Sequence, residues 1–486
     1  MKRYLSCLLI FSIIYFTFSS CIEVPTDVRM VDDELPMYPD YTDVTVPVNI
    51  APLSFLLRSD AEAVWVYAND EEIYSGRGNE VVFDEEDWKA FLENNVGKDI
   101  KVRVVVKNNG EWQEYPSFTW RVVADKVDPY LTYRLIEPDY EVWNNLVIQE
   151  RCVENFETRN ICDYGVVGNK CMNCHNYAGQ DPNMSMFYLR GEGGGAILNQ
   201  NGRLSKLNLK SDDMVSSSVY FGFSPNKRYI VFSTNVIVPA FHSLGSRRME
   251  VFDSASDVYV ADLENKTFIR SELLADTTQY ETFPAFSPDG KYIYYCTTHR
   301  LDSLGGLENM RYSLCRISFD QKTGEIGTEV DTVYNARVEG KSVCHPRISP
   351  DGRYLVFSTA AYGTFPLWHR EARLEIMDLE TSRHHPMNLK SRKPNVGSDS
   401  YHSWSSNSRW LVFASKRDDG LYGKPYYTYI NKKGECSKPF VLPQAHPSFY
   451  DNCLKSFNAP EQGTGKVPFT APDVKKVMST SAVEFH

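Results

Sequence analysis

The sequence lacks several features that would assign it to common functional classes. It contains no dense run of Lys or Arg, and its 52 basic and 63 acidic residues give a net charge of −11. This balance disfavours binding to nucleic acid. No Gly-x-Ser-x-Gly pentapeptide occurs, so the nucleophile turn of α/β-hydrolase-type serine peptidases is missing. Because we find no set of acid, base and nucleophile, the sequence favours a protein that is not an enzyme.

A long membrane-spanning run is also missing. The longest apolar run at the N-terminus covers residues 5–18, follows Lys2 and Arg3, and precedes Ser19, Ser20 and Cys21. This order is typical of an export signal, and the run is shorter than the ~20 residues that a membrane helix needs. We therefore expect export rather than a permanent transmembrane anchor.

Residues 18–21 resemble a bacterial lipobox. The resemblance implies that residues 1–20 are a lipoprotein signal peptide, that Cys21 is acylated, and that lipid attaches the protein to a membrane. Ile22 follows Cys21, which in related lipoproteins favours the outer membrane, so we expect the cell envelope, facing the periplasm or the cell surface. Phe18 stands where Leu is usual, and ordinary secretion or an uncleaved anchor stay open as alternatives. Residues 21–43 are expected to form a tether.

The body of the chain reads as β-structure. Short runs of β-favouring residues separated by Asn, Gly and Asp turns predict an immunoglobulin-like β-sandwich over residues 44–125. The acidic run at residues 84–87, before Trp88, predicts the start of a helix. We expect residues 126–200 to be a linker with a cofactor segment, residues 201–470 to form a second domain, and residues 471–486 to form a tail.

An internal repeat defines the second domain. Residues 223–233, 286–296, 348–358 and 404–414 share a pattern close to Phe-Ser-Pro-Asp-Gly-Lys/Arg-Tyr followed by apolar residues. Each copy predicts a strand end, a tight turn and a second strand. The spacing of the copies exceeds the roughly 40 to 50 residues of a minimal propeller blade, so long loops should decorate the faces.

The repeat resembles that of TolB-type β-propellers. The resemblance implies six blades, two of them degenerate, one built from residues before 220 and one from residues after 420. The expected fold class is all-β: an immunoglobulin-like sandwich followed by a TolB-like propeller, with a loop or helix insertion that carries a cofactor.

The cofactor prediction depends on the pentapeptide Cys171-Met172-Asn173-Cys174-His175. Cys-x-x-Cys-His is the attachment motif of c-type cytochromes, in which both thiols form thioethers with haem and the His binds iron. The motif therefore predicts covalent haem c held by Cys171, Cys174 and His175. A zinc site, a thioredoxin-like redox pair and a plain disulfide or relic motif stay open.

The sixth iron ligand is open at this point. Met184 and Met186 follow the motif closely, and His242 and His402 lie next to repeats. A thioether ligand would raise the haem potential, whereas we rank the histidines slightly higher. Core packing for the methionines and an ordinary loop position for the histidines are the alternatives.

The remaining cysteines suggest local pairs in an oxidising compartment. Cys152 with Cys162, and Cys436 with Cys453, are close enough in sequence to form disulfides, and Cys296 is expected to be a free buried thiol.

The order of these segments resembles a group of uncharacterised Bacteroidetes lipoproteins, and residues 401–410 and 415–420 carry much of the likeness. That group implies no reaction. Two hypotheses follow. The first is a lipid-anchored c-type haem protein for electron transfer or redox-linked binding, with an envelope redox partner. The alternative is a propeller module that binds a protein or glycan in the envelope without haem, through aromatic loops such as residues 362–368 and 422–429.

Overall fold

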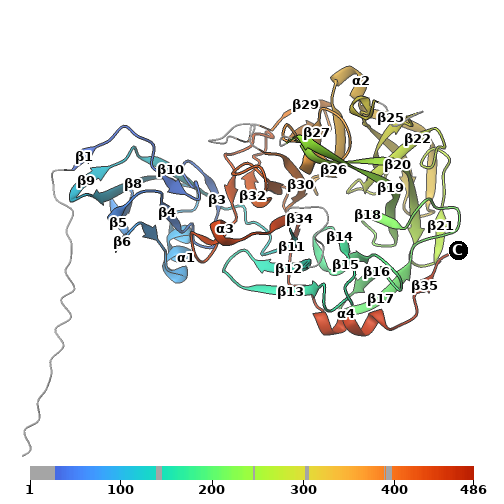
Figure 1. Ribbon diagram of the computed structural model, residues 1–486, viewed down its shortest axis with the longest axis horizontal. Helices are drawn as coiled ribbons and strands as arrows, with labels where there is room; N and C mark the ends of the chain where they lie inside the picture. The colour runs from blue at the N-terminus through green and yellow to red at the C-terminus, as the bar shows by residue number, and fades with distance from the viewer. Residues whose placement is uncertain (1–27, 138–144, 245–246, 302–305, 388, 390–396) are drawn as a thin grey trace, which may run out of the picture.

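The structure is a computed structural model that describes residues 28–137, 145–244, 247–301, 306–387, 389 and 397–486. Two β-rich bodies lie side by side, and the smaller one contains the N-terminal part of the chain (Figure 1). No helix in these described ranges is long and apolar enough to cross a membrane. The predicted signal peptide, residues 1–20, and Cys21 lie outside the described residues.

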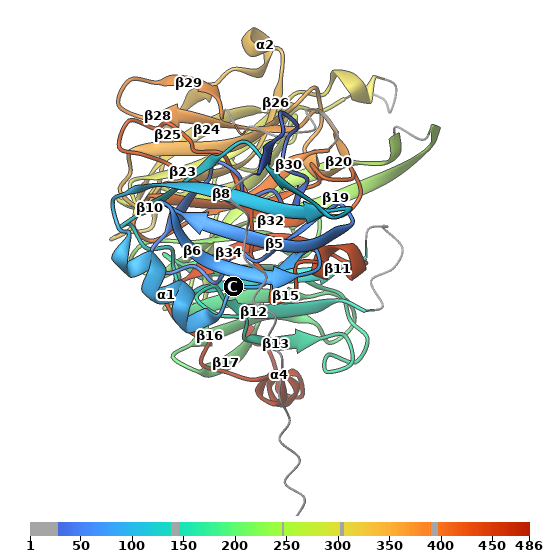
Figure 2. The ribbon, with the colours of Figure 1, turned by 90° about the vertical axis from the view of Figure 1, so that its left-hand side faces the viewer.

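The smaller body is the predicted sandwich, but it begins before residue 44, because residues 29–30 and 37–38 of the predicted tether pair within its sheets. One sheet contains β1 (Arg29–Met30), β9 (Glu111–Glu114), β8 (Asp99–Asn108), β10 (Phe118–Val123), β3 (Thr45–Pro47), β5 (Ala61–Ala68) and β6 (Glu71–Arg77). The second contains β2 (Met37–Tyr38), β4 (Phe55–Leu57) and β7 (Glu80–Val81). Figure 2 shows the broad sheet and the adjacent helix α1 (Glu85–Asn94) from the sandwich side. The architecture is therefore an all-β sandwich with one added helix.

The acidic run begins α1 as predicted. The carboxylate of Asp84 accepts hydrogen bonds from the backbone N–H groups of Glu86 and Asp87, which satisfies two of the free amides at the helix start. On the inner side of the helix, Trp88 is buried and its indole N–H donates to the carbonyl of Ile50 at 3.1 Å. The acids are exposed while the aromatic residue attaches the helix to the core.

The larger body is a β-propeller whose described strands form six blades. The first blade contains β34 (Ser456–Gly463), β11 (Tyr130–Ile136), β12 (Val147–Cys152) and β13 (Thr158–Asp163). The second contains β14 (Met172–Ala178), β15 (Asp181–Leu189), β16 (Gly195–Gln200), β17 (Arg203–Asn208) and β35 (Val483–Glu484). The third blade contains β18 (Ser218–Phe223), β19 (Tyr229–Leu244), β20 (Arg247–Asp262) and β21 (Thr267–Ile269). The fourth contains β22 (Gln279–Phe286), β23 (Tyr292–His299), β24 (Ser313–Asp320) and β25 (Glu325–Tyr334).

The last two blades complete the circle in Figure 1. The fifth blade contains β26 (Ser342–Ile348), β27 (Tyr354–Ala360), β28 (Arg373–Asp378) and β29 (Arg383–Pro386). The sixth contains β30 (Asp399–Trp404), β31 (Trp410–Ser415), β32 (Lys424–Tyr429) and β33 (Phe440–Val441). The short helices α2 (Ala336–Glu339), α3 (Phe449–Asn452) and α4 (Ala471–Met478) lie between strands of different blades, whereas η1 (Leu307–Asn309) and η2 (Pro366–Trp368) lie within the fourth and fifth blades. Neighbouring inner strands, β34, β14, β18, β22, β26 and β30, contact one another around the centre.

The repeat motif is explained by one serine in each copy. The hydroxyl of Ser224 donates to Asn226 Oδ1 at 2.6 Å and accepts from the backbone N–H of Tyr229 at 2.9 Å, so it fixes the turn between two strands. Equivalent pairs of contacts occur at Ser287, Ser349 and Ser405. Side-chain bonds of this kind are why Ser, Asp and Asn recur at turns.

The domain boundaries differ from those predicted. The segment 126–200 is not a linker, because β11 to β16 are blade strands, and the propeller therefore begins near Tyr130 rather than at residue 201. Both degenerate blades precede β18, and the part of the chain after residue 420 contributes β34 to the first blade. The predicted tail, residues 471–486, contains α4 and β35, which pairs with β17. Periodicity missed these blades because they lack the serine turn.

Candidate functional site

A cavity of about 270 Å³ lies at the centre of the propeller. Its walls come mainly from the inner strands of the blades, and Ile237, Val251, Phe365 and Trp368 line one end of it. Val251 and Phe365 form a small apolar cluster with the other two side chains, which brings the long hairpin of β19 and β20 against η2. The cavity is therefore built from segments far apart in the sequence.

Each inner strand carries one residue with a left-handed backbone at the cavity. These six residues, which we call the collar, are Cys174 (φ 55°), Tyr220 (φ 52°), Phe283 (φ 50°), His345 (φ 54°), Tyr401 (φ 39°) and Ala459 (φ 48°). A register shift occurs at the same place in each of the six blades. Such bulges change the direction of a side chain, and positive φ is uncommon for residues other than glycine. The collar is thus a repeated local device rather than an accident of one strand.

Four consecutive collar residues form an aromatic arc on blades three to six. The ring centroids of Tyr220 and Phe283 lie 4.3 Å apart, those of Phe283 and His345 4.0 Å, and those of His345 and Tyr401 4.6 Å. The rings are tilted against one another, as aromatic pairs prefer. The other two collar residues, Cys174 and Ala459, are small, so the arc covers one side of the cavity.

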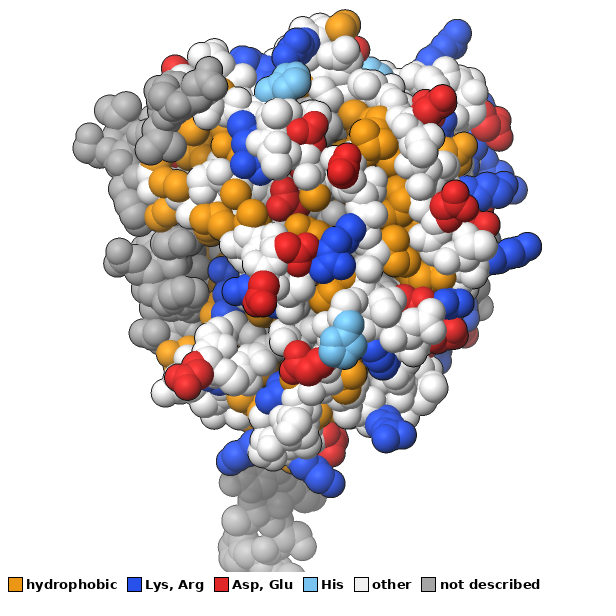
Figure 3. All heavy atoms as spheres, turned by 90° about the vertical axis from the view of Figure 1, so that its right-hand side faces the viewer, with side chains coloured by type: hydrophobic (Ala, Val, Ile, Leu, Met, Phe, Trp, Pro, Cys, Tyr) orange, Lys and Arg blue, Asp and Glu red, His pale blue; other side chains and the backbone are white. Residues whose placement is uncertain are grey.

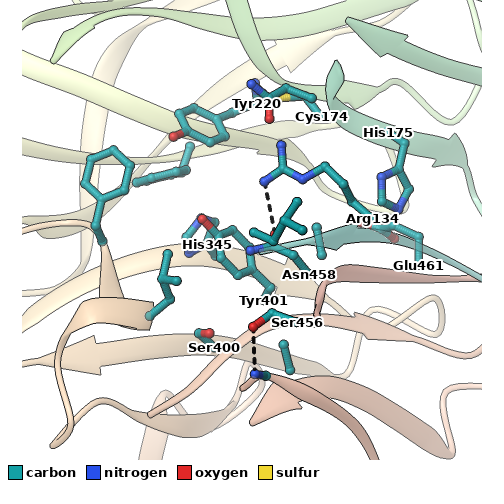
Figure 4. A pocket seen from close by; sticks show the side chains of 18 of the residues that line it. Arg134, Cys174, His175, Tyr220, His345, Ser400, Tyr401, Ser456, Asn458 and Glu461 are labelled. Atoms are coloured by element: carbon teal, nitrogen blue, oxygen red, sulfur yellow. Dashed lines mark hydrogen bonds between the residues drawn. The ribbon is translucent and has the colours of Figure 1, made fainter. Parts of the chain in front are cut away.

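Cationic groups lie on the other side, on blades one and two. Within the described residues, neither Arg134 nor Arg190 has a carboxylate partner; Arg134 donates to the Met172 carbonyl at 3.1 Å and weakly to Asn458 Oδ1 at 3.4 Å (Figure 4). Arg190 makes no side-chain hydrogen bond in that part of the chain. A half-buried guanidinium without a carboxylate attracts anions.

A third arginine in the cavity is paired. Arg347 Nη2 donates to Glu461 Oε1 at 2.6 Å. Burial raises the pKa of Glu461 to about 7, although the neighbouring Arg347 opposes the shift. The charge of this wall therefore changes near neutral pH.

Several polar groups of the collar have no protein partner. Both ring nitrogens of His345 are buried without a hydrogen bond in the described structure. Burial holds the pKa of His345 well below its usual value, so the imidazole is neutral. The hydroxyls of Tyr220 and Tyr401 also make no hydrogen bond with described residues. Because buried polar groups are nearly always satisfied, the two ring nitrogens of His345 point to a bound ligand or water.

The Cys-x-x-Cys-His motif does not lie in a loop or helix insertion, as predicted. Met172 to His175 belong to β14, the inner strand of the second blade. Cys171 packs against the apolar cluster between the first and second blades, whereas Cys174 packs against the one between the second and third. Cys171 lies just before β14, and the register shift between Asn173 and Asn176 interrupts the regular alternation of side chains at Cys174.

These positions do not fit a covalently bound haem. Two thioethers to one haem need both thiols on one side, and Cys171 does not line the cavity that Cys174 reaches. His175 is turned toward the first blade, where its Nε2 lies 3.2 Å from the Thr132 carbonyl oxygen, and burial lowers its pKa to about 4. Figure 4 shows Cys174 beside Tyr220 and His175 apart from it. We therefore derive no chemistry from haem.

The candidate sixth ligands are not gathered near His175. Met184 and Met186 lie on β15 and are buried in an apolar cluster. His402 is buried next to Tyr401, its Nε2 lies 3.0 Å from the Val356 carbonyl oxygen, and burial lowers its pKa to about 3. His242 belongs to β19, and its side chain lies outside the described part. The alternative roles therefore apply: the two methionines pack in the core, and His402 makes an ordinary hydrogen bond.

The remaining cysteine predictions also change. All nine described cysteines are free thiols, so the proposed pairs Cys152–Cys162 and Cys436–Cys453 are not formed. Cys296 is free and buried, as expected. Among the described residues, no three His, Cys, Asp or Glu side chains gather as a metal site, which leaves the zinc alternative without ligands there.

The sequence analysis missed the collar, although a signal was present. Tyr220, Phe283, His345 and Tyr401 each lie four positions before a repeat serine. An aromatic residue or His at a fixed distance before every turn could have identified them. Of the two aromatic loops that were expected to bind, residues 362–368 supply Phe365, Leu367 and Trp368, whereas residues 422–429 supply Gly423 and none of their aromatic side chains.

No family model matches the chain, and no curated protein matches it. Solved structures with some likeness include a Mycobacterium tuberculosis puromycin-hydrolyzing peptidase (10% identity, 85% of this chain and 56% of that chain, TM-score 0.34). A DUF4784 family protein from Bacteroides caccae (9%, 73% and 96%, 0.30) and Porphyromonas gingivalis dipeptidyl peptidase 4 (9%, 72% and 58%, 0.31) are similar to the same degree. The chain thus spans little more than half the length of either peptidase. At such low TM-scores the likeness carries no argument, and the propeller assignment depends on the strand pairing.

Proposed function

We propose that the protein is a binding protein whose central cavity holds an organic anion with an apolar part. This proposal adopts the binding hypothesis of the sequence analysis and not electron transfer through haem. The observation that carries it is the pair Arg134 and Arg190, which line the cavity without a carboxylate partner among the described residues.

The charge of the cavity supports an anion. Among the described residues, four basic side chains line it, those of Arg134, Arg190, Arg347 and Lys416, against the two acidic ones of Glu137 and Glu461. The chain as a whole carries a net charge of −11, so a cationic cavity is contrary to its composition. Positive groups in a recess with low-dielectric walls attract and hold anions.

The aromatic arc supports an apolar part of the ligand. A concave site lined by aromatic rings with a few polar groups is typical of small-molecule binding. An ion such as sulfate has no apolar part that could pack against the rings of Phe283 and Tyr401. The protein would act from the cell envelope if Cys21 is lipidated, as predicted.

The experiment is a calorimetric titration with cyclohexanecarboxylate, and with cyclohexanecarboxamide as its neutral counterpart. We expect the acid to bind and the amide to bind at least tenfold more weakly, since a charged hydrogen bond contributes about 1.5–3 kcal/mol. Arg190→Gln should remove most of this difference. Arg337→Gln, on the exposed surface of α2, is the matched control and should have no effect. Equal binding of acid and amide would contradict the proposal.

A further inference from the structure

We propose that the anion bound in the central cavity is an acidic sugar, a ring that carries both hydroxyls and a carboxylate. This inference rests on the proposed function and adds the ligand class. It comes from the collar, whose free hydrogen-bonding groups are too many for a simple carboxylate.

His345 is the centre of the argument. Its Nδ1 and Nε2 are buried without a partner in the described structure, and the ring lies between Phe283 and Tyr401. A neutral imidazole has one donor and one acceptor. A hydroxyl can satisfy either nitrogen, whereas a carboxylate can only accept. Two hydroxyls of a sugar therefore match this side chain better than an acid group does.

Two tyrosine hydroxyls add to the same wall. Tyr220 and Tyr401 flank His345 in the arc, and neither hydroxyl has a hydrogen bond with described residues. Both side chains line the cavity and are labelled in Figure 4. Four hydrogen-bonding atoms, on three lining side chains of three different blades, thus have no partner among the described residues. A ligand with several hydroxyls would satisfy them together.

The opposite wall fits the acid group. Arg134 reaches into the cavity from β11, and Asn458 Oδ1 accepts its weak hydrogen bond (Figure 4). Arg190 comes from the end of β15. A carboxylate placed here would receive charged hydrogen bonds while its ring carbons contact the aromatic arc, because C–H edges pack against the negative faces of aromatic rings.

The size of the cavity and the outer surface agree with this class. At about 270 Å³ the cavity lies just below the roughly 300 Å³ at which small-molecule sites begin, which suits one sugar residue and not a long segment of chain. The side of the propeller away from the sandwich shows basic and acidic side chains interspersed (Figure 3). The unpartnered cations of the cavity are therefore a local feature.

The test compares three six-membered rings in calorimetric titrations of the protein: glucuronate, glucose and cyclohexanecarboxylate. Glucuronate has both hydroxyls and an acid, and each of the others has one of the two. We expect glucuronate to bind about tenfold or more tightly than either. The double variant Tyr220→Phe/Tyr401→Phe removes two hydroxyls and keeps both rings. It should lower glucuronate affinity about tenfold and leave cyclohexanecarboxylate unchanged.

Tyr422→Phe is the matched control. Tyr422 lines the cavity at the junction of sandwich and propeller and not the central one, so its substitution should change neither affinity. A circular-dichroism melt of each variant establishes that the blades are intact. His345→Phe, which keeps a ring in the arc, gives a second variant and should weaken glucuronate in the same way.

The outcomes separate the two proposals. If cyclohexanecarboxylate binds and glucuronate binds no more tightly, the anion-binding function stands and the sugar inference is overturned. If glucose binds as tightly as glucuronate, the acid requirement fails for both. If the affinity for glucuronate is unchanged both in the double tyrosine variant and in His345→Phe, the collar does not bind the hydroxyls of the sugar, and the sugar inference is overturned. If none of the three binds, both proposals are wrong.

Discussion

The central cavity and a second cavity differ in how their polar groups are satisfied. The second lies at the junction of sandwich and propeller and is larger, about 520 Å³ against about 270 Å³. Its charged groups are paired: Arg58 donates to Asp451 at 2.7 Å, and Lys424 donates to Asp418 at 2.7 Å and to the Tyr38 hydroxyl at 3.3 Å. In the central cavity, His345 and the two unpaired arginines have no such partners.

The difference shows that volume alone does not identify a ligand site. Space at the junction is left over where two domains meet, and its polar groups hold the domains together. In the central cavity a bulge positions His345, and both of its ring nitrogens are buried without a partner among the described residues. Because an unsatisfied buried polar group costs free energy, it persists in a native structure when something else satisfies it.

Covalent haem would have the largest effect on the comparison of the two cavities. It would occupy the central cavity and contact the polar groups that have no partner there. We expect no haem band on a denaturing gel of protein made in a host with c-type maturation. The reason is that Cys171 and Cys174 contact different core clusters. Cys171→Ala/Cys174→Ala is the control and should look the same. A haem-stained band in the parent alone would restore the cytochrome hypothesis.

Asp418→Asn tests whether the junction acts on stability. The change leaves the buried Lys424 ammonium without its carboxylate, so the free energy of unfolding should fall by about 2 kcal/mol. Urea unfolding followed by tryptophan fluorescence measures this. Asp419→Asn, at the exposed neighbouring position, should change it by less than about 0.5 kcal/mol.

Asp418→Asn should leave the affinity for cyclohexanecarboxylate unchanged. If Asp418→Asn lowered the affinity and left the stability unchanged, the roles that we assign to the two cavities would be reversed, because the ligand would be recognised at the junction.

The smallest expected effect is a pH dependence of anion binding. The pKa of Glu461 is raised to about 7, and the groups that interact with it are Arg347 on β26 and Tyr177 on β14. Protonation below this value removes a negative charge from the cavity wall. The affinity for cyclohexanecarboxylate should therefore rise about threefold from pH 8 to pH 6. In Glu461→Gln the affinity should not vary with pH; an equal variation there would exclude Glu461 as its source.

Much of the fold could be predicted from local sequence signals. The repeat serine forms two hydrogen bonds within its own turn, so each copy of the motif specifies a hairpin without help from the rest of the chain. The same holds for α1, which begins at Asp84 because that side chain accepts from two amides of its own first turn. Signals of this kind survive in the sequence because their partners are neighbours.

The rest depended on contacts between distant residues. The first two blades lack the serine turn, and the first exists because β34 pairs with β11, more than three hundred residues away. The motif at residues 171–175 was assigned from its spacing alone. Its strand conformation, set by pairing with β15, separates the thiols that the motif would bring together on a helix or loop. The collar could not be recognised because bulges follow from strand register.

The pairing of β34 with β11 also has a consequence for the order in which the protein is made. Residues 456–463 form the inner strand of the first blade and supply Asn458, Ala459 and Glu461 to the cavity wall. A chain that is still emerging from the ribosome or a translocation channel can form the hairpins of blades two to six, each from nearby residues. It has no complete binding cavity until this late segment arrives, so ligand cannot be captured by an unfinished molecule.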